Sequence, residues 1–198
     1  SQDVLVTSTT GITANTIKGV TIHSALNLPV PPRRFCDLSE ASMREFQTNY
    51  SDINILVIDE FSMLRAKELF YVSERLKQIK CNNNTYGGML VLLVGDPGQL
   101  PPVLGKALWG NDRTSGHDQL GRILFTSMLH VFHLDRNLRL DQIDSNATFF
   151  DTFLRRLRNG ELDKDDYEYV SKNCCRHHMG ENARNYVSSF FNRNKIAS

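Results

Sequence analysis

The sequence has almost no excess charge of either sign and few cysteines. Its 198 residues carry a formal net charge of +1, so any binding to phosphates has to come from local clusters of charge. Its four cysteines are too few and too irregularly spaced for a disulfide framework, which favours reduced thiols in an intracellular compartment. The run Cys174–His178 holds two cysteines and two histidines. Because neighbours along a chain point apart, we do not expect a zinc site with four converging ligands there.

Long apolar runs and a leader segment are also missing. The longest apolar runs, such as Met89–Val94, are far too short to cross a bilayer. The chain opens on Ser1-Gln2-Asp3 rather than on a charged leader before an apolar run. It also has no initiating Met, so we expect the sequence to start inside a longer protein.

The sequence does contain an alternation of strand-like and helix-like stretches. Strands are predicted at 3–8, 53–59, 89–96 and 131–134. Helices are predicted after a turn within 10–19, at 39–50 with Ser39 as N-cap, and over 61–80. In the last of these, apolar residues recur at helical spacing: Leu69, Val72, Leu76 and Ile79. This order predicts an α/β fold with a parallel sheet whose apolar strands are covered on both faces.

The later part of the chain changes in character. Residues Pro97–Asp118 are rich in Gly and Pro and form too long a connection to be ordinary, so the segment is either functional or mobile. After Leu140 we expect two helices broken at Asn159-Gly160, a usual helix stop. One more strand is expected within 185–198.

Acidic residues follow two of the predicted strands. Asp59 and Glu60 end the second strand, and Gly95-Asp96 ends the third. Ligands of open parallel sheets bind beyond the carboxyl ends of the strands. Two acids there suit a nucleoside triphosphatase, in which the first holds Mg²⁺ and the second polarises the attacking water. An acidic pair of this kind also suits the N-terminus of a following helix, so the pair alone leaves both interpretations open.

The third strand adds a more specific signal. It runs into "PGQLPPV", which puts the amide of Gln99 near a strand end, where it can sense a γ-phosphate or orient water. The alternative is a Pro-rich turn, but a turn does not require Gly-Asp-x-x-Gln before a double proline. The two motifs together are therefore more specific than either alone.

With these motifs the sequence resembles the Pif-type DNA helicases, a family that includes the helicase part of Helitron transposons and is related to RecD-type subunits. The motifs that carry the resemblance are, in order, "VTSTTGITANTIKGVTIHSAL", "LVIDEFSM", "GDPGQLPPV" and "LDRNLRL". They lie within residues 4–140, and "FLRRLRNGEL" and "FFNRN" extend the likeness more loosely. The resemblance implies ATP-driven motors that move five-prime to three-prime along single-stranded DNA. It also implies a RecA-like sheet, with a first motor domain at 1–135 and the start of a second at 136–198.

The resemblance assigns nucleotide roles to five residues. It implies that Asp59 holds Mg²⁺, that Glu60 is the catalytic base and that Gln99 senses the γ-phosphate of ATP. It places Asp96 among the nucleotide-binding residues. It also implies that Arg139 reaches the γ-phosphate from the second motor domain, where a bidentate guanidinium neutralises transferred charge. The alternative for Arg139 is an ordinary surface or helix-capping arginine.

The resemblance also implies a DNA contact made by hydroxyls, backbone N–H groups and a histidine near the N-terminus. Its candidate residues are Thr10, Gly11, Thr21, His23 and Ser24. His23 either stacks on a base or donates to a phosphate, and the alternative is a satisfied buried histidine at a helix start. Further phosphate contacts from Arg155, Arg156 and Arg158 compete with the interpretation of a solvated helix face.

A phosphate-cradling loop of the Gly-Lys-Ser/Thr type is absent from these residues. The only Gly-Lys pair, Gly105-Lys106, precedes Ala107 and follows no apolar strand directly. The family places this loop upstream of Ser1 and its late motifs after Ser198, so we expect a fragment cut at both ends.

The sequence therefore favours a fragment of an ATP-dependent DNA helicase of DNA repair, recombination or telomere maintenance. Its expected partners are single-stranded DNA, DNA junctions and Mg-ATP, in the nucleus or mitochondrion of a eukaryote. Two alternatives stay open: a degenerate relative that serves as a DNA-binding or interaction module, and a stand-alone metal-dependent hydrolase. The last lacks the further acids or histidines that would complete its site.

Overall fold

The chain is built of two compact units that divide between Val131 and Phe132. The computed structural model describes residues 3–29, 35–110, 112–134 and 145–174. Within these ranges the first unit contains a four-stranded sheet with helices, and the second contains helices.

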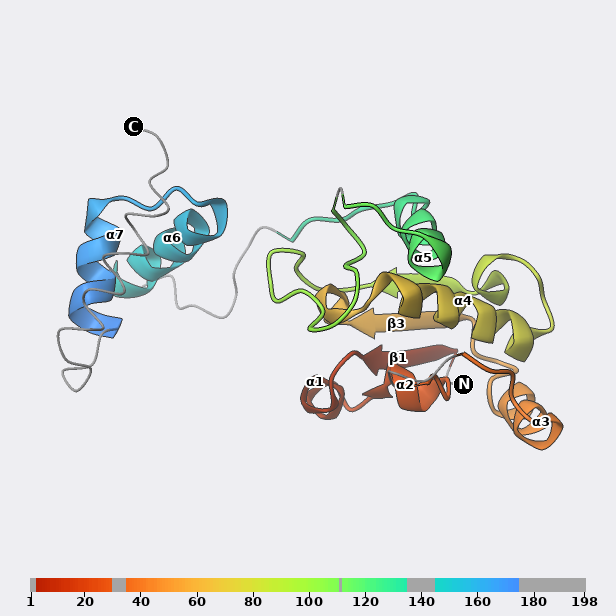
Figure 1. The fold of residues 1–198 in the computed structure, drawn as a ribbon. Coiled ribbons are helices and arrows are strands. Elements are labelled where there is room, and N and C mark those ends of the chain that lie inside the picture. Colours follow the sequence, from red (N-terminus) through yellow and green to blue (C-terminus); the bar gives the residue numbers. More distant parts are fainter. Residues whose placement is uncertain (1–2, 30–34, 111, 135–144, 175–198) are drawn as a thin grey trace. The chain divides into compact units, whose positions relative to one another are not determined.

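The sheet of the first unit is parallel throughout. Its strands are β1 (Val4–Ser8), β2 (Val20–Thr21), β3 (Ile55–Asp59) and β4 (Leu90–Leu93). They are hydrogen-bonded in the order β2-β1-β3-β4. Figure 1 shows β1 and β3 side by side and pointing the same way. The predicted α/β fold with a parallel sheet and flanking helices is confirmed.

The core forms between β3 and helix α4 (Ala66–Lys80). Leu56 and Ile58 of β3 are fully buried. The helical residues predicted from their spacing are buried as well: Leu69, Val72, Leu76 and Ile79. Each such side chain contributes roughly 1.5–3 kcal/mol by leaving water, so this interface fixes the position of the strand end that follows β3.

Strand β4 corrects the expectation that every apolar strand is covered on both faces. Leu90 and Leu92 are 56% and 42% exposed, whereas Val91 and Leu93 pack against the core. Within the described sheet β4 pairs only with β3, so it is an edge strand. Its side chains alternate between the two faces of the sheet, and only one of these faces reaches the core.

The strand predicted at 131–134 is wrong. These residues have no regular structure, and Val131, Phe132 and Leu134 are largely exposed. The fourth strand is instead β2, whose Val20 and Thr21 pair with the end of β1. A short apolar run makes a strand only where a neighbouring strand accepts its hydrogen bonds. Strand β2 has two residues, which is too short for a periodic pattern of apolar residues to be seen in the sequence.

Short helices surround the sheet. Helix α3 (Glu40–Asn49) begins as predicted, because the Ser39 hydroxyl accepts a hydrogen bond from the Ser42 N–H at 3.3 Å. The other helical elements of this unit are α1 (Gly11–Thr16), α2 (Ile22–Ala25), η1 (Phe61–Met63), η2 (Thr85–Gly88) and α5 (Gly116–Thr126). Helix α5 lies within and beyond the segment predicted to be irregular, and it packs beside α4 (Figure 1).

The second unit confirms the pair of helices predicted after Leu140. Helix α6 (Ser145–Asn159) is followed by Gly160, which has φ 74°, and α7 (Lys164–Tyr169) leads into a π-helical turn, η3 (Val170–Cys174). The strand predicted within 185–198 lies outside the described residues. Among the helices of the described ranges, none is long and apolar enough to span a bilayer.

Candidate functional site

The ends of three parallel strands meet at one edge of the sheet. Ser8, the last residue of β1, pairs directly with Asp59, the last residue of β3. The Thr9 N–H then donates to the Asp59 carbonyl at 3.2 Å, and the Phe61 N–H donates to the Val94 carbonyl at 3.1 Å. The predicted acids therefore lie between the polar segment after β1 and the Gly-Asp segment after β4.

Glu60 turns the chain sharply away from the sheet. Its backbone lies in the left-handed region, with φ 55° and ψ 43°, which a residue other than glycine rarely adopts. The Thr9 hydroxyl donates to the Glu60 carbonyl at 3.0 Å and holds this turn from the neighbouring strand end. Asp59 and Glu60 are both half-buried, so this edge of the sheet is partly open to solvent.

Gly95 brings the end of β4 against this turn. It has φ 146°, and a Cβ added there would lie 3.1 Å from the Phe61 nitrogen and 3.3 Å from the Glu60 Cα. A side chain at this position would push the two strand ends apart. The absence of one lets the Gly-Asp segment pass directly beside Glu60.

Asp96 organises the turn that carries Gln99. Its carboxylate accepts a hydrogen bond from the Gly98 N–H at 2.8 Å, and its carbonyl accepts one from the Gln99 N–H at 3.0 Å. Gln99 is exposed. The structure thus gives Asp96 a role in shaping the turn and leaves the Gln99 side chain available at the strand-end edge.

The donor atoms at this edge fit a magnesium ion that arrives with a nucleotide. Carboxylate oxygens are the ligands that Mg²⁺ prefers, and Mg²⁺ commonly uses one or two of them together with substrate phosphates and water. In the described part of the chain no three acidic, histidine or cysteine side chains gather as a metal site of their own. Asp59 therefore suits a Mg²⁺ ion that arrives with a nucleotide, whose phosphates complete the coordination.

Two of the candidate DNA-contact hydroxyls serve as helix caps. The Thr10 hydroxyl accepts from the Thr13 N–H at 3.3 Å, and the Thr21 hydroxyl accepts from the Ser24 N–H at 3.2 Å. Gly11 and Ser24 are exposed, and a Cβ added at Gly11 would meet nothing within 4 Å. The backbone around Gly11 is thus open to a ligand, while the two threonines already fix the starts of α1 and α2.

His23, the fifth candidate DNA contact, is held from inside the protein. Its Nε2 lies 3.0 Å from Glu68 Oε1, and its side chain is 23% exposed. This arrangement matches the alternative of a satisfied histidine at a helix start. The ring is nevertheless not enclosed, so one part of it still reaches the surface.

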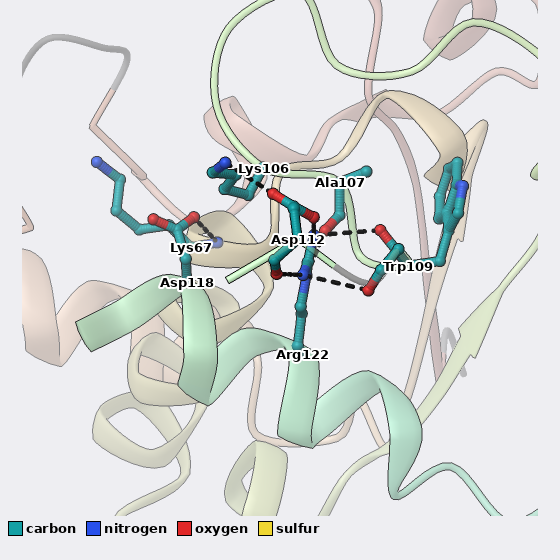
Figure 2. A network of polar contacts seen from close by, with 8 residues as sticks. Lys67, Lys106, Ala107, Trp109, Asp112, Asp118 and Arg122 are labelled. Atoms are coloured by element: carbon teal, nitrogen blue, oxygen red, sulfur yellow. Dashed lines mark hydrogen bonds and ion pairs between the residues drawn. The ribbon is translucent and has the colours of Figure 1, made fainter. Parts of the chain in front are cut away.

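The long loop after β4 is fastened to α5 by one arginine (Figure 2). The guanidinium of Arg122 pairs with the Asp112 carboxylate, which also accepts from Lys106 Nζ at 2.7 Å. Arg122 also donates to backbone carbonyl groups, namely those of Ala107, Trp109, Gly110 and Asp112. The hydrogen bonds from Lys106 and Arg122 lower the pKa of Asp112 to about 2. The segment of this loop nearest to α5 is therefore fixed.

The remaining sequence candidates lie in the second unit or outside the described residues. Arg139 and most of the run Cys174–His178 fall outside them. Arg156 makes two hydrogen bonds to the fully buried Asp166 carboxylate, and these contacts lower the pKa of that carboxyl. Arg155 pairs with Asp151 at 3.0 Å. Arg155 is thus paired within α6, whereas Arg156 joins α6 to α7.

Sequence reasoning missed several residues that shape the site. They are Thr9, Arg65, Glu68, Gly95 as a close-approach glycine, and Arg122. The hydrogen bonds from Thr9 and Arg122 go to backbone carbonyl groups outside their own elements, and the contact of Glu68 with His23 joins distant segments, so these contacts leave no local pattern. Two local signals existed: Gly95 directly follows a strand and precedes an acid, and Arg65 and Glu68 stand three residues apart at the start of α4.

The fold and the strand-end acids define a parallel-sheet α/β protein with an acidic strand-end edge. The family model of the PIF1-like helicases matches residues 1–168. The chain belongs to the PIF1-like helicase family, which confirms the resemblance seen in the motifs.

Curated relatives agree with this assignment. The chain is 29% identical over 168 residues to the ATP-dependent DNA helicase PIF1 of Candida albicans, an overlap that covers 83% of this chain and 18% of the relative. It is 34% identical over 172 residues to PIF1 of Emericella nidulans, covering 80% of this chain and 20% of the relative. The chain thus spans no more than about a fifth of the length of these relatives.

Solved structures share the fold. The Pif1 helicase from Candida albicans superimposes with a TM-score of 0.63 at 25% identity, covering 84% of this chain and 36% of that one. A structure of Bacteroides Pif1 bound to single-stranded DNA gives a TM-score of 0.63 at 22% identity, covering 99% of this chain and 47% of that one. These likenesses support the predicted RecA-like sheet.

Proposed function

We propose that the whole protein is an ATP-driven helicase that moves five-prime to three-prime along single-stranded DNA. The observation that carries the proposal is the meeting of strand ends: Ser8 pairs with Asp59, and Gly95 lies against Glu60. Parallel sheets bind ligands at this edge, and the family to which the chain belongs consists of helicases.

Each strand-end residue has a role in this proposal. Asp59 holds the Mg²⁺ of Mg-ATP, which when bound neutralises charge on the phosphates. Glu60 takes a proton from the attacking water, and Gln99, on the turn shaped by Asp96, senses the γ-phosphate. Arg139 reaches the same phosphate from the second motor domain. The division of the structure at Val131 supports a first motor domain at 1–135 and a second that starts at 136.

DNA binds, in this proposal, along the segment after β1 and at the start of α2. The exposed backbone at Gly11 and the exposed Ser24 suit phosphate contacts that read no sequence. We extend the proposal to forks and junctions met in DNA repair, recombination and telomere maintenance. In support, a similar solved structure, at 25% identity and a TM-score of 0.62, concerns unwinding at forked DNA by two coordinating Pif1 helicases.

Replacement of the proposed base tests the function directly. In the whole protein, Glu60→Gln keeps the size of the side chain but cannot accept the proton. We expect Mg-ATP binding to persist while DNA-stimulated phosphate release falls about 10²-fold or more. A fluorescent-nucleotide titration and a phosphate-release assay measure the two effects.

Glu45→Gln is the matched control, because Glu45 is an exposed glutamate on α3. It should leave both binding and turnover unchanged. Near-normal phosphate release from Glu60→Gln would refute the assigned role. A wild-type protein that binds DNA without hydrolysing ATP would favour a DNA-binding module instead.

A further inference from the structure

The carboxylate of Glu68 is a buried junction of three hydrogen-bond donors. Glu68 is only 4% exposed, although it lies in the first turn of α4. Its Oε1 faces His23 Nε2 at 3.0 Å and the Arg65 guanidinium at 2.9 Å. Its Oε2 accepts from the Arg65 backbone N–H at 3.0 Å. Both oxygens are therefore engaged, and each has a defined partner.

These contacts fix the state of the His23 ring. Burial by itself raises the pKa of Glu68, but the hydrogen bonds from His23 and Arg65 and the charge of the Arg65 guanidinium outweigh it, so the pKa lies below its usual value. An ionised carboxylate only accepts hydrogen bonds, so His23 Nε2 carries the hydrogen. Within the described part of the chain, Nδ1 has no hydrogen-bond partner. The ring is thus held through Nε2, and its partly exposed side chain keeps Nδ1 without a partner among the described residues.

The same junction reaches the segments around the strand-end acids. Arg65 is the N-cap of α4 and stands at the end of the turn that begins at Glu60. It also forms an isolated antiparallel bridge with Ala107, and the Ala66 N–H donates to the Lys106 carbonyl at 2.8 Å. Glu68 therefore joins α2 to the turn after β3 and, through Arg65, to the loop after β4.

We propose that Glu68 is a positioning residue for DNA binding: it orients His23 toward the DNA backbone and ties that contact to the segment that follows Asp59 and Glu60. The inference rests on the proposed function for its DNA ligand. It adds that α4, which has no residue among the candidate DNA contacts, determines how tightly the segment at Thr21–Ser24 binds single strands.

Glu68→Gln is the sharpest test, because it keeps the volume and removes one acceptor. Three donor groups converge on two oxygens, and a glutamine offers a single acceptor oxygen. One of the donors must then face an amide N–H group, so His23 and the Arg65 N–H cannot both stay bonded. Either the bond from His23 or the bond from the Arg65 N–H is then lost, which loosens this junction while the packing of α4 is largely kept.

The experiment is a double-mutant cycle in the whole protein with Glu68→Gln, His23→Ala and both together. An oligo-dT strand is titrated by fluorescence anisotropy without nucleotide, and DNA-free ATP turnover and thermal unfolding are followed in parallel. We expect Glu68→Gln to weaken DNA binding about five- to tenfold. In the His23→Ala background the same change should have no further effect, which a merely structural role would not produce.

Glu74→Gln is the matched control on the same helix, since Glu74 pairs with Lys77 on the outer side of α4. It should leave DNA binding unchanged. Equal losses in both backgrounds, or unchanged binding by Glu68→Gln, would overturn the proposal. So would a wild-type protein that binds no DNA. Loss of ATP turnover with DNA binding intact, by contrast, would contradict only the proposed helicase activity.

A spectroscopic readout covers the case in which Glu68→Gln does not fold. In the wild-type protein with ¹⁵N-labelled histidine, the His23 signals are assigned by their absence in His23→Ala. We expect the Nε2–H tautomer in the free protein and a shift of Nδ1 when oligo-dT is added. The opposite tautomer, or no response of Nδ1 to DNA, would contradict the orientation inferred from Glu68.

Discussion

Individual residues at the strand ends decide how closely the site assembles. Glu60 adopts a left-handed backbone without being a glycine, and it is held there by the Thr9 hydroxyl. Such conformations cost of order 1–3 kcal/mol and persist only where the surroundings enforce them. At this position the enforcing groups belong to the segments that follow β1 and β4, so the geometry of the proposed base depends on its neighbours.

Gly95→Ala is the residue-scale test of that dependence. The new Cβ would lie 3.1 Å from the Phe61 nitrogen, and the backbone has φ 146°, which disfavours any side chain. We expect a loss of about 1–3 kcal/mol in unfolding free energy. We also expect reduced ATP turnover in the whole protein, because Asp96 and Gln99 move with the strand end. Chemical denaturation and phosphate release measure the two.

Gly11→Ala is the matched control for stability, because an added Cβ there meets nothing within 4 Å. Alanine favours the helix that starts at Gly11, so this variant should be neutral or slightly stabilising. A Gly95→Ala protein as stable as the wild type would show that β3 and β4 do not require their close approach.

At the scale of elements, the sequence predicted the parts whose pattern is local. Apolar runs located β1 and β3, and helical spacing located the buried face of α4. Helix α5 was not predicted, because Gly116 and Gly121 are residues typical of loops. Gly121 is needed for packing, since a Cβ there would lie 1.7 Å from the Ala66 carbonyl oxygen. Only the tertiary contact explains that glycine, so local reasoning could not place the helix.

The site follows the same division. Asp59, Glu60 and Gln99 could be singled out because a motif follows a strand. The hydrogen bond between His23 and Glu68 could not, because it joins α2 to α4 across the fold. The position of a strand at the edge of a sheet also cannot be predicted from its own sequence. The apolar sequence of β4 predicts a buried strand, yet only β3 pairs with it among the described strands.

The hydrogen bonds that Arg122 makes between α5 and the loop after β4 give an element-scale prediction (Figure 2). Arg122→Lys keeps the charge but loses the planar fork that reaches several backbone carbonyl groups and Asp112 at once. We expect a loss of about 1–3 kcal/mol in unfolding free energy. Amide hydrogen exchange should increase over residues 105–112, as mass spectrometry of peptides can measure.

Arg113→Lys is the control for Arg122→Lys, because Arg113 is exposed in the same loop. It should leave exchange unchanged. The lowered pKa of Asp112 also predicts a direction of pH dependence. The stabilising contribution of this carboxylate is present above its ordinary pKa of 3.8 and disappears as pH falls through about 2. Exchange protection that is equal in Arg122→Lys and wild type would show that the loop is held by other contacts.

At the scale of the whole molecule, the chain divides into two units, and the proposed chemistry needs groups from both. Asp59, Glu60 and Gln99 lie in the first unit, while the proposed arginine, Arg139, belongs to the sequence of the second. Positioning of phosphates is most of what catalyses phosphoryl transfer. In the proposed mechanism, catalysis therefore requires Arg139 in addition to the strand-end residues of the first unit.

A polypeptide of only these 198 residues gives the last prediction. It contains no Gly-Lys-Ser/Thr sequence to cradle the β- and γ-phosphates, although its strand-end acids are in place. We expect no Glu60-dependent phosphate release, with or without single-stranded DNA, because a carboxylate edge alone holds Mg-ATP only weakly. Matched Glu60→Gln and wild-type polypeptides are compared at equal concentration after circular dichroism has shown that both are folded. Turnover that Glu60→Gln abolishes would mean that a phosphate site exists elsewhere within these residues.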